Sequence, residues 1–228
     1  MQFNNLPEKS TTASNTQQSL LSTHTVLRNT YFLLSLTLLF SALMTFVAVR
    51  INAQPNWLIA IIGIFGLMFL TMKLRNSIWG LASIFAFTGF VGFCMGPLVG
   101  MIIKDYSNGA NIVMTAFGGT GVIFFALSAY VLTTRKNFNA IGGFLFVALL
   151  VAIVAIVANL FLQIAALQLV ISAVLVLIFS GFILYDTSRI INNGERNYIM
   201  ATIALYLDII NLFQNLLILI SAFSGNRN

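Results

Sequence analysis

Charged side chains are scarce in this chain of 228 residues, where Asp, Glu, Lys and Arg make up only 7%. An ordinary soluble domain carries about 25%, so these charges are too few to cover a soluble globule of this size. Apolar residues make up 59%, and the high mean hydropathy of +0.98 holds along nearly the whole chain. The composition therefore excludes a soluble catalytic domain on a membrane anchor and predicts one membrane domain.

Residue types that carry much of enzyme chemistry are also rare. Cys94 is the only cysteine, which excludes a disulfide framework or a cysteine metal cluster within one chain. His24 is the only histidine, so zinc-hydrolase motifs and a histidine-based catalytic relay are absent. A retinal protein would need a lysine in the middle of its last helix, and the last apolar run has none. We therefore expect a protein that is not an enzyme and has no organic cofactor.

Seven apolar runs separated by short polar breaks follow one another along the chain. Each is close to the ~20 residues that a helix needs to cross a hydrocarbon core about 30 Å thick. The second run is the shortest, and Lys73 and Arg75 can reach the membrane surface from a helix that continues past it. The runs comprise residues 29–49, 57–72, 78–103, 112–132, 140–162, 167–185 and 199–221. The sequence therefore predicts an all-α integral membrane fold with seven transmembrane helices.

The amino-terminal segment, residues 1–21, differs from the rest because it is rich in Asn, Gln, Ser and Thr. Its apolar content is too low to offset the entropy of folding, so we expect a flexible cytoplasmic tail ahead of a membrane domain of residues 22–228. The first apolar run is too long for the core of a secretory signal and lacks a small-residue cleavage site. We therefore expect this run to stay in the protein.

The basic residues indicate how the helices are oriented. Lys and Arg number 11 against 5 Asp and Glu, but they occur singly or in pairs, which excludes a basic patch for nucleic acid. Eight lie in the tail or after even-numbered runs: Lys9, Arg28, Lys73, Arg75, Arg135, Lys136, Arg189 and Arg196. Three lie on the other side: Arg50, Lys104 and Arg227. The positive-inside rule then predicts a cytoplasmic amino terminus and a periplasmic carboxyl terminus.

Two acidic residues lie at or inside apolar runs: Asp186 ends the sixth run and Asp208 lies within the seventh. Asp208 is about 13 Å along a helix from Ile199, near mid-membrane. A charge there costs roughly 2.5–3.5 kcal/mol and is expected to face the interior of the bundle. Asn211 and Asn215 share its helix face, whereas the opposite face is apolar. We therefore expect the last helix to turn a polar face toward its neighbours and an apolar face away from them.

The two aspartates are open to two interpretations. A short loop joins their helices, so the carboxyl groups can lie near each other and share a proton or hold a cation, with Lys73 and Arg75 as counter-charges. The alternative is structural. Asp186 then pairs with Arg189 at i,i+3, and Asp208 hydrogen-bonds in protonated form to hold helices together. The residue pattern leaves both interpretations open.

Glycines gather in the third and fourth runs. Small residues at a spacing of four let two helix backbones approach closely, and we expect them to serve packing inside the protein rather than a dimer interface. The third run also holds Pro97, which predicts a kink. No strand precedes the glycines of the fourth run, which argues against a nucleotide-binding loop. The glycines concerned are Gly92, Gly96 and Gly100 in the third run and Gly118, Gly119 and Gly121 in the fourth.

Four stretches are long and specific enough to identify a relationship: LLSTHTVLRNTYFLLSLTL from Leu20, SAYVLTTRK from Ser128, VANLFLQ from Val157 and NGERNYI from Asn193. They resemble the bacterial branch of the transmembrane Bax inhibitor motif family, and within it the inner-membrane proteins that modulate the FtsH protease. The resemblance runs from about Ser19 to the end of the chain and so spans all seven runs.

This resemblance implies a seven-helix fold in which the last helix is central and surrounded by the other six. It also implies a bacterial inner-membrane protein that binds FtsH and its HflK and HflC partners and slows the degradation of other membrane proteins. Such a protein is itself a substrate of FtsH, pulled in by its cytoplasmic tail. The amino-terminal segment fits that role because it is expected to be unfolded and on the protease side.

Another branch of the family resembles a pH-sensitive calcium leak. Its motif is one aspartate in each of the last two helices and a latching arginine at the end of the second helix. Asp186 and Asp208 match the aspartate pair, and Arg75 matches the latch. The resemblance thus implies calcium as an ion that these aspartates could bind. Regulation of FtsH is our main functional hypothesis, and a cation leak gated by the aspartate pair is the alternative.

The charge distribution makes the orientation testable. A reporter enzyme fused after Arg227 should behave as periplasmic, and fusions near Asn76, Asn137 or Asn193 should behave as cytoplasmic, because the basic loops stay inside. A cytoplasmic carboxyl terminus would show that one of the seven runs does not cross the membrane.

Overall fold

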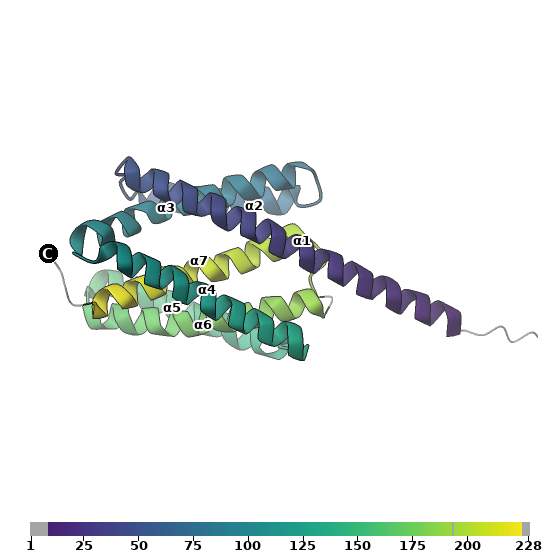
Figure 1. Cartoon of the computed structure of the whole chain (residues 1–228). Coiled ribbons are helices and arrows are strands. Elements are labelled where there is room, and N and C mark those ends of the chain that lie inside the picture. Colours follow the sequence, from purple (N-terminus) through teal and green to yellow (C-terminus); the bar gives the residue numbers. More distant parts are fainter. Residues whose placement is uncertain (1–8, 193, 225–228) are drawn as a thin grey trace, which may run out of the picture.

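The structure, a computed structural model, describes residues 9–192 and 194–224, with side chains from His24 onward. The described part is helical and contains no strand. Its helices run back and forth in one bundle (Figure 1). They are α1 (Lys9–Arg50), α2 (Trp57–Leu74), α3 (Trp79–Asp105), α4 (Gly109–Thr134), the 3-10 helix η1 (Asn139–Ile141), α5 (Gly142–Leu162), α6 (Ala165–Ile191) and α7 (Tyr198–Phe223).

All seven predicted spans are confirmed, since within the described residues seven helices are long and apolar enough to cross a membrane. Most helix ends lie within a few residues of the predicted ends. There are two exceptions: α1 begins well before residue 29, and α6 continues to Ile191, six residues beyond its predicted end at 185. The segment after Tyr185 is polar but has no glycine or proline, so the helix persists past the apolar run. Asp186 therefore lies inside a helix rather than at its end.

The first helix is much longer than its apolar run. It begins at Lys9, so residues 9–21, where the sequence predicted a flexible tail, are helical in the structure. No glycine or proline occurs between Lys9 and Arg50, and adding residues to an existing helix is far easier than nucleating a new one. The start of α1 projects beyond the other helices, at the end of the bundle opposite the carboxyl terminus (Figure 1). Residues 1–8 of the predicted tail lie outside the described residues.

Helix α7 occupies the centre of the bundle, as predicted. It packs against α1, α3, α4 and α6, and none of its residues from Tyr198 to Ser221 is exposed. The predicted outward apolar face is therefore wrong, because Ile199, Ile203 and Leu217 are buried. The expectation of six surrounding helices also needs correction. Helix α2 packs mainly on α3, and α5 mainly on α6, so these two helices form the outside of the bundle.

Glycines allow α1 and α3 to pack closely, which confirms the predicted role of the small residues in the third run. A Cβ atom at Gly92 would clash with the Ser41 backbone, and one at Gly96 with the Ala48 side chain. The closeness also permits a hydrogen bond from Thr45 Oγ1 to the Gly92 carbonyl at 2.7 Å. Helix α3 remains helical through Pro97.

The fourth run behaves differently from the third. A Cβ atom at Gly118 or at Gly121 would meet no described atom within 4 Å. Gly119 has only one near neighbour, Leu216 Cδ1 at 3.8 Å. The predicted packing role is therefore wrong for Gly118 and Gly121, whose side of α4 faces outward.

This contrast predicts the effect of valine at two glycines. Gly96→Val should lower the thermal midpoint of the detergent-solubilised protein by several degrees, because overpacking costs about 1–3 kcal/mol. Gly118→Val, the matched control, adds the same side chain to an open helix face and should leave the midpoint nearly unchanged. Equal midpoints for the two variants would contradict the close packing of α1 against α3.

Candidate functional site

The predicted aspartate pair lies where α6 turns into α7. Asn197 caps the start of α7 by accepting hydrogen bonds from the backbone N–H groups of Ile199 and Met200, at 3.0 and 3.1 Å. Its side-chain amide donates to the Arg75 carbonyl at 3.1 Å and to Asn76 Oδ1 at 2.9 Å. These bonds tie the α6–α7 connection to the end of α2, which fixes α6 and α7 side by side.

The two carboxyl groups meet between these helices, as the short connection predicted. Asp186 is 9% exposed and Asp208 is 5% exposed. The carboxyl groups approach closely enough to share a hydrogen bond. Because two ionised carboxylates have no proton to donate, that bond requires a proton on one of them. One further oxygen, Asp208 Oδ2, is buried with no hydrogen-bond partner among the described residues.

A cavity of about 170 Å³ adjoins Asp186 at this end of the bundle. Asp208 does not line it, so Asp186 lies between the cavity and the deeper aspartate. The lining is acidic and basic on one side and apolar on the other. Its residues are Asp186, Arg189, Ile190, Glu195, Met200, Ala201 and Ala204.

Arg189 is the cation of this site. Its guanidinium lies 3.5 Å from Asp186 Oδ1 and 3.6 Å from Glu195 Oε2, so it bridges two carboxylates. It also lies over the ring of Tyr185, 5.5 Å from the ring centroid, within the limit of about 6 Å for a cation–π contact. The i,i+3 ion pair between Arg189 and Asp186, which the structural interpretation predicted, is thus present. So is the proximity of Asp186 to Asp208 that the functional interpretation required.

The predicted counter-charges on α2 do not reach the aspartates. Arg75 and Lys73 have exposed side chains, and neither forms an ion pair with any described carboxylate. The physical reason is that α2 lies on the outside of the bundle and packs mainly on α3. The α2 end contacts the site through its backbone instead, since the Arg75 carbonyl accepts the hydrogen bond from Asn197.

Glu195 is a site residue that sequence reasoning missed. It lines the cavity, pairs with Arg189 and accepts a hydrogen bond from the Asn197 N–H at 2.8 Å. The sequence feature that could have identified Glu195 as a site residue is its position in the short connection that follows Asp186. Any acidic residue in such a short connection must lie close to both helix ends.

Asn211 and Asn215, which were predicted to support Asp208, form their hydrogen bonds with other groups. Asn211 Nδ2 donates to the Leu207 carbonyl at 2.8 Å, and Asn215 Nδ2 donates to the Asn211 carbonyl at 2.8 Å. Both bonds remain within α7. Neither amide hydrogen-bonds to Asp208 among the described residues, so the two asparagines share its helix without contacting its carboxyl group.

The site does not have the composition of a resident calcium centre. Calcium takes six to eight oxygen ligands, whereas the described part of the chain brings no three His, Cys, Asp or Glu residues into a metal-binding arrangement. Arg189 also occupies the position where a cation would approach Asp186. What the arrangement can do chemically is exchange a proton within the pair, or exchange Arg189 for another cation beside Asp186.

Comparison with known proteins agrees with the fold. The sequence model of the family described as inhibitor of apoptosis-promoting Bax1 matches residues 23–225. The "Modulator of FtsH protease YccA" of Escherichia coli (strain K12) is 49% identical over 206 residues, which cover 90% of this chain and 93% of that protein. An uncharacterized protein of Pseudomonas aeruginosa is 50% identical over 202 residues, covering 88% and 90%. An "Uncharacterized membrane protein" of Vibrio cholerae is 41% identical over 217 residues, covering 94% and 97%.

These matches extend over the whole seven-helix domain. A relative from a second Escherichia coli strain, also 49% identical over 206 residues, is named "Inner membrane protein YccA". Together with seven apolar helices long enough to span a bilayer, this makes the chain a multi-pass inner-membrane protein. Because the family model covers nearly the full length, the chain belongs to the Bax inhibitor family, the family described as inhibitor of apoptosis-promoting Bax1.

Proposed function

We propose that this protein modulates the FtsH protease: it binds FtsH together with HflK and HflC, slows the degradation of other membrane proteins, and is itself a substrate. The observation that carries this proposal is the 49% identity to a modulator of FtsH protease over 90% of this chain and 93% of that relative. Identity that extends over every helix supports a shared function better than similarity confined to one motif. The names of the family and of this relative suggest a membrane regulator rather than an enzyme.

The length of α1 supports the substrate role. Its apolar run begins at Asn29, so residues 9–28 of the helix precede that run. At 1.5 Å per residue these residues extend about 30 Å beyond the apolar run. If the amino terminus is cytoplasmic, as the charge distribution predicts, this projecting segment and the residues before it lie where a cytoplasmic protease can grip them.

Deleting residues 2–19 tests the proposal. The shortened protein should persist longer than the parent in cells with active FtsH, because the segment that the protease grips is gone. Its lifetime is measured by pulse-chase labelling, and membrane insertion is checked by fractionation. In cells with inactive FtsH the parent and the shortened protein should have equal lifetimes.

The proposed slowing of the degradation of other membrane proteins is measured in the same cells. Overproducing the parent should lengthen the lifetime of another membrane protein that FtsH degrades, and affinity purification of the parent should recover FtsH with HflK and HflC. If the parent neither co-purifies with FtsH nor changes the lifetime of its other substrates, the modulator proposal is wrong.

A cation leak remains the second candidate function, and the aspartate site favours it. An aspartate pair that can share a proton lies beside a cavity of about 170 Å³ that opens at the end of the bundle. Every charged group that faces Asp186 is accounted for: Asp208 on α7, Arg189 on α6, and Glu195 on the connection, the last acting through Arg189. We propose that a second proton on the pair weakens the hold of Asp186 on Arg189. The guanidinium then leaves the cavity, and cation access depends on pH.

Asparagine variants test this second function. Ion flux through the purified protein in liposomes should vary with pH around neutrality, and Asp186→Asn and Asp208→Asn should each abolish that dependence, because either change removes the shared proton. Asp105→Asn alters a carboxylate at the opposite end of the bundle and should behave like the parent. Parent-like flux and pH dependence in both pair variants would show that the pair is structural.

The two functions can be separated with the same proteins. An amide has nearly the same shape as a carboxyl group and can still hydrogen-bond. The asparagine variants should therefore still co-purify with FtsH if its modulation does not depend on ion passage.

A further inference from the structure

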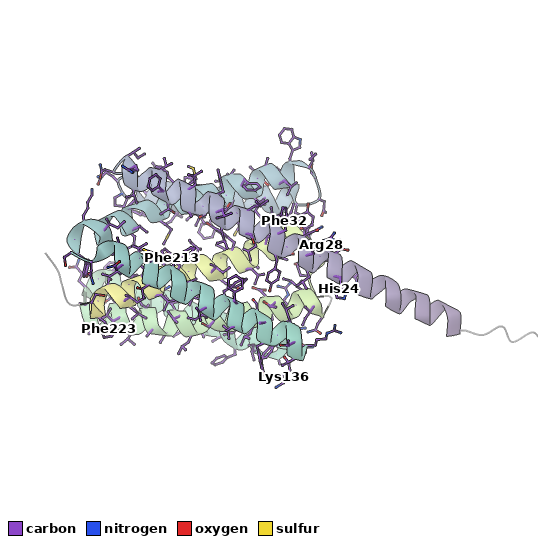
Figure 2. The ribbon with its side chains drawn as sticks, in the orientation of Figure 1. His24, Arg28, Phe32, Lys136, Phe213 and Phe223 are labelled. Carbon is purple, nitrogen blue, oxygen red and sulfur yellow. The ribbon has the colours of Figure 1, made fainter. Side chains whose placement is uncertain are left out.

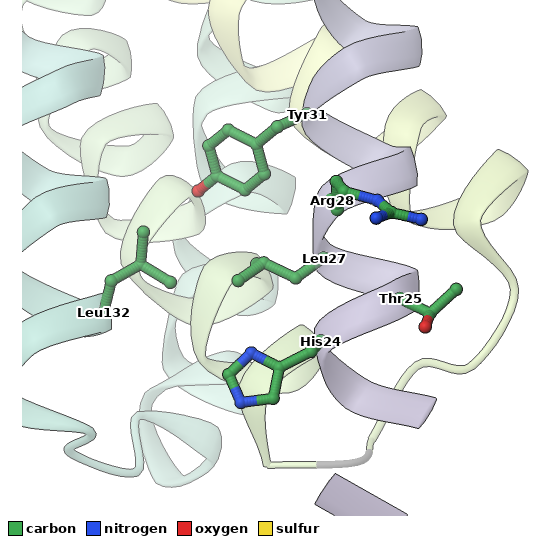
Figure 3. Close-up of a pocket in the computed structure, with 6 residues that line it drawn as sticks. All are labelled: His24, Thr25, Leu27, Arg28, Tyr31 and Leu132. Atoms are coloured by element: carbon green, nitrogen blue, oxygen red, sulfur yellow. The ribbon is translucent and has the colours of Figure 1, made fainter. Parts of the chain in front are cut away.

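A second cavity, larger than the one beside Asp186, lies at the same end of the bundle between α1 and α4. Its volume is about 480 Å³, within the range of ordinary ligand pockets. The residues around it are His24, Thr25, Leu27, Arg28, Tyr31 and Leu132. Figure 3 shows His24, Leu27 and Tyr31 pointing from α1 toward Leu132 on α4, whereas the Arg28 guanidinium and the Thr25 side chain extend to the other side of α1. None of these residues belongs to the aspartate site.

The two helices that line this cavity meet at its inner end, where the rings of Tyr31 on α1 and Phe124 on α4 lie 6.0 Å apart. Toward the mouth, the lining consists of α1 residues and Leu132 of α4. An opening between two outer membrane helices faces the bilayer, and lipid is the molecule that has access to it.

The height of the cavity in the membrane is set by both helices. His24 lies five residues before the apolar run of α1, which begins at Asn29, and Leu132 lies just before the end of α4 at Thr134. Figure 2 shows His24 and Arg28 where α1 leaves the bundle, at the same end as Lys136 and opposite Phe223. The mouth of the cavity is therefore at headgroup level. Tyr31 lies seven residues further along α1, about 10 Å deeper at 1.5 Å per residue.

The polarity of the lining changes with this depth. At the mouth, His24 and Arg28 stand one helical turn apart, and both are exposed. Arg28 forms no ion pair with a described carboxylate. Further in, the walls are Leu27 and Leu132. At the inner end, the Tyr31 hydroxyl lies beside Ser128 and Thr187 but is buried without a hydrogen bond of good geometry.

We propose that this cavity binds an anionic phospholipid of the leaflet on the amino-terminal side. Arg28 and His24 hold the phosphate, because a guanidinium pairs with phosphate through several hydrogen bonds. The upper part of an acyl chain lies between Leu27 and Leu132. A free phosphate ion would use the basic mouth but would leave the apolar walls without a partner. A phospholipid headgroup and a free phosphate ion would both be bound through phosphate. Only the phospholipid also fills the apolar part of the cavity.

The experiment compares lipids and variants by native mass spectrometry of the purified full-length protein in detergent. Phosphatidylglycerol and phosphatidylcholine with identical acyl chains are titrated separately. The parent should retain phosphatidylglycerol at lower concentrations than phosphatidylcholine. Arg28→Gln should weaken phosphatidylglycerol binding by about tenfold, as expected for the loss of a charge-assisted hydrogen bond. Leu132→Trp keeps every charge, fills the apolar part and should weaken binding of both lipids.

Two controls make the result decisive. Arg196→Gln removes one exposed charge at the same end of the bundle and should bind lipid like the parent. Inorganic phosphate alone, at concentrations far above that of the lipid, should not displace phosphatidylglycerol. Circular dichroism and gel filtration confirm that each variant is folded.

Three results would overturn the proposal. The first is equal lipid binding by the parent, Arg28→Gln and Leu132→Trp. The second is an equal loss of binding in Arg196→Gln, which would indicate attraction to net charge alone. The third is displacement by inorganic phosphate at concentrations comparable to the lipid, which would identify a free-phosphate site.

Discussion

Helix α7 is enclosed by protein along its length, and the arrangement of the other helices depends on how its polar groups are satisfied there. Lipid offers no hydrogen-bond partner, so every polar group in the hydrocarbon region needs one inside the protein. Tyr206, fully buried on α7, shares a hydrogen bond of 2.7 Å with Ser41 on α1 and donates one of 3.0 Å to the Thr88 carbonyl on α3. One phenol thus joins three helices. The small residues that let α1 approach α3 are what make this arrangement sterically possible.

The aspartate site follows the same requirement in the first half of α7. Asp208 cannot reach lipid or bulk water, so its carboxyl group is placed against Asp186, which in turn meets Arg189 near the surface. Charge is therefore neutralised in steps, from a buried pair to a partly exposed guanidinium and then to Glu195. Such an arrangement stabilises the α6–α7 contact when undisturbed. A proton or a cation gained at this site would change the charge balance among these residues. The same residues can therefore have both a structural and a functional role.

The larger cavity is linked to α6 by three neighbouring polar side chains, those of Tyr31, Ser128 and Thr187. Tyr31, at the inner end of the larger cavity, lies beside Thr187, and Thr187 directly follows Asp186 in α6. Ser128 on α4 is within 3.4 Å of the Thr187 hydroxyl. A molecule held between α1 and α4 would therefore contact Tyr31, which lies beside the helix that carries half of the aspartate pair.

The sequence by itself determined the membrane location, the seven helices and the candidate pair, because hydrophobic run length and an acidic residue in an apolar run are local properties. It also indicated that α7 has polar residues to bury. It could not determine that α7 is buried on its apolar side too, since Ile199 and Leu217 look the same in sequence whether they face lipid or protein. Nor could it tell that α1 is helical from Lys9, because helix propagation depends on the stable span that follows. Only the tertiary structure decided that Arg189 rather than Arg75 is the counter-charge and that Glu195 joins the site. The physical reason is that an ion pair forms between charges that packing brings together, and the position of α2 outside the bundle is set by contacts distant in sequence.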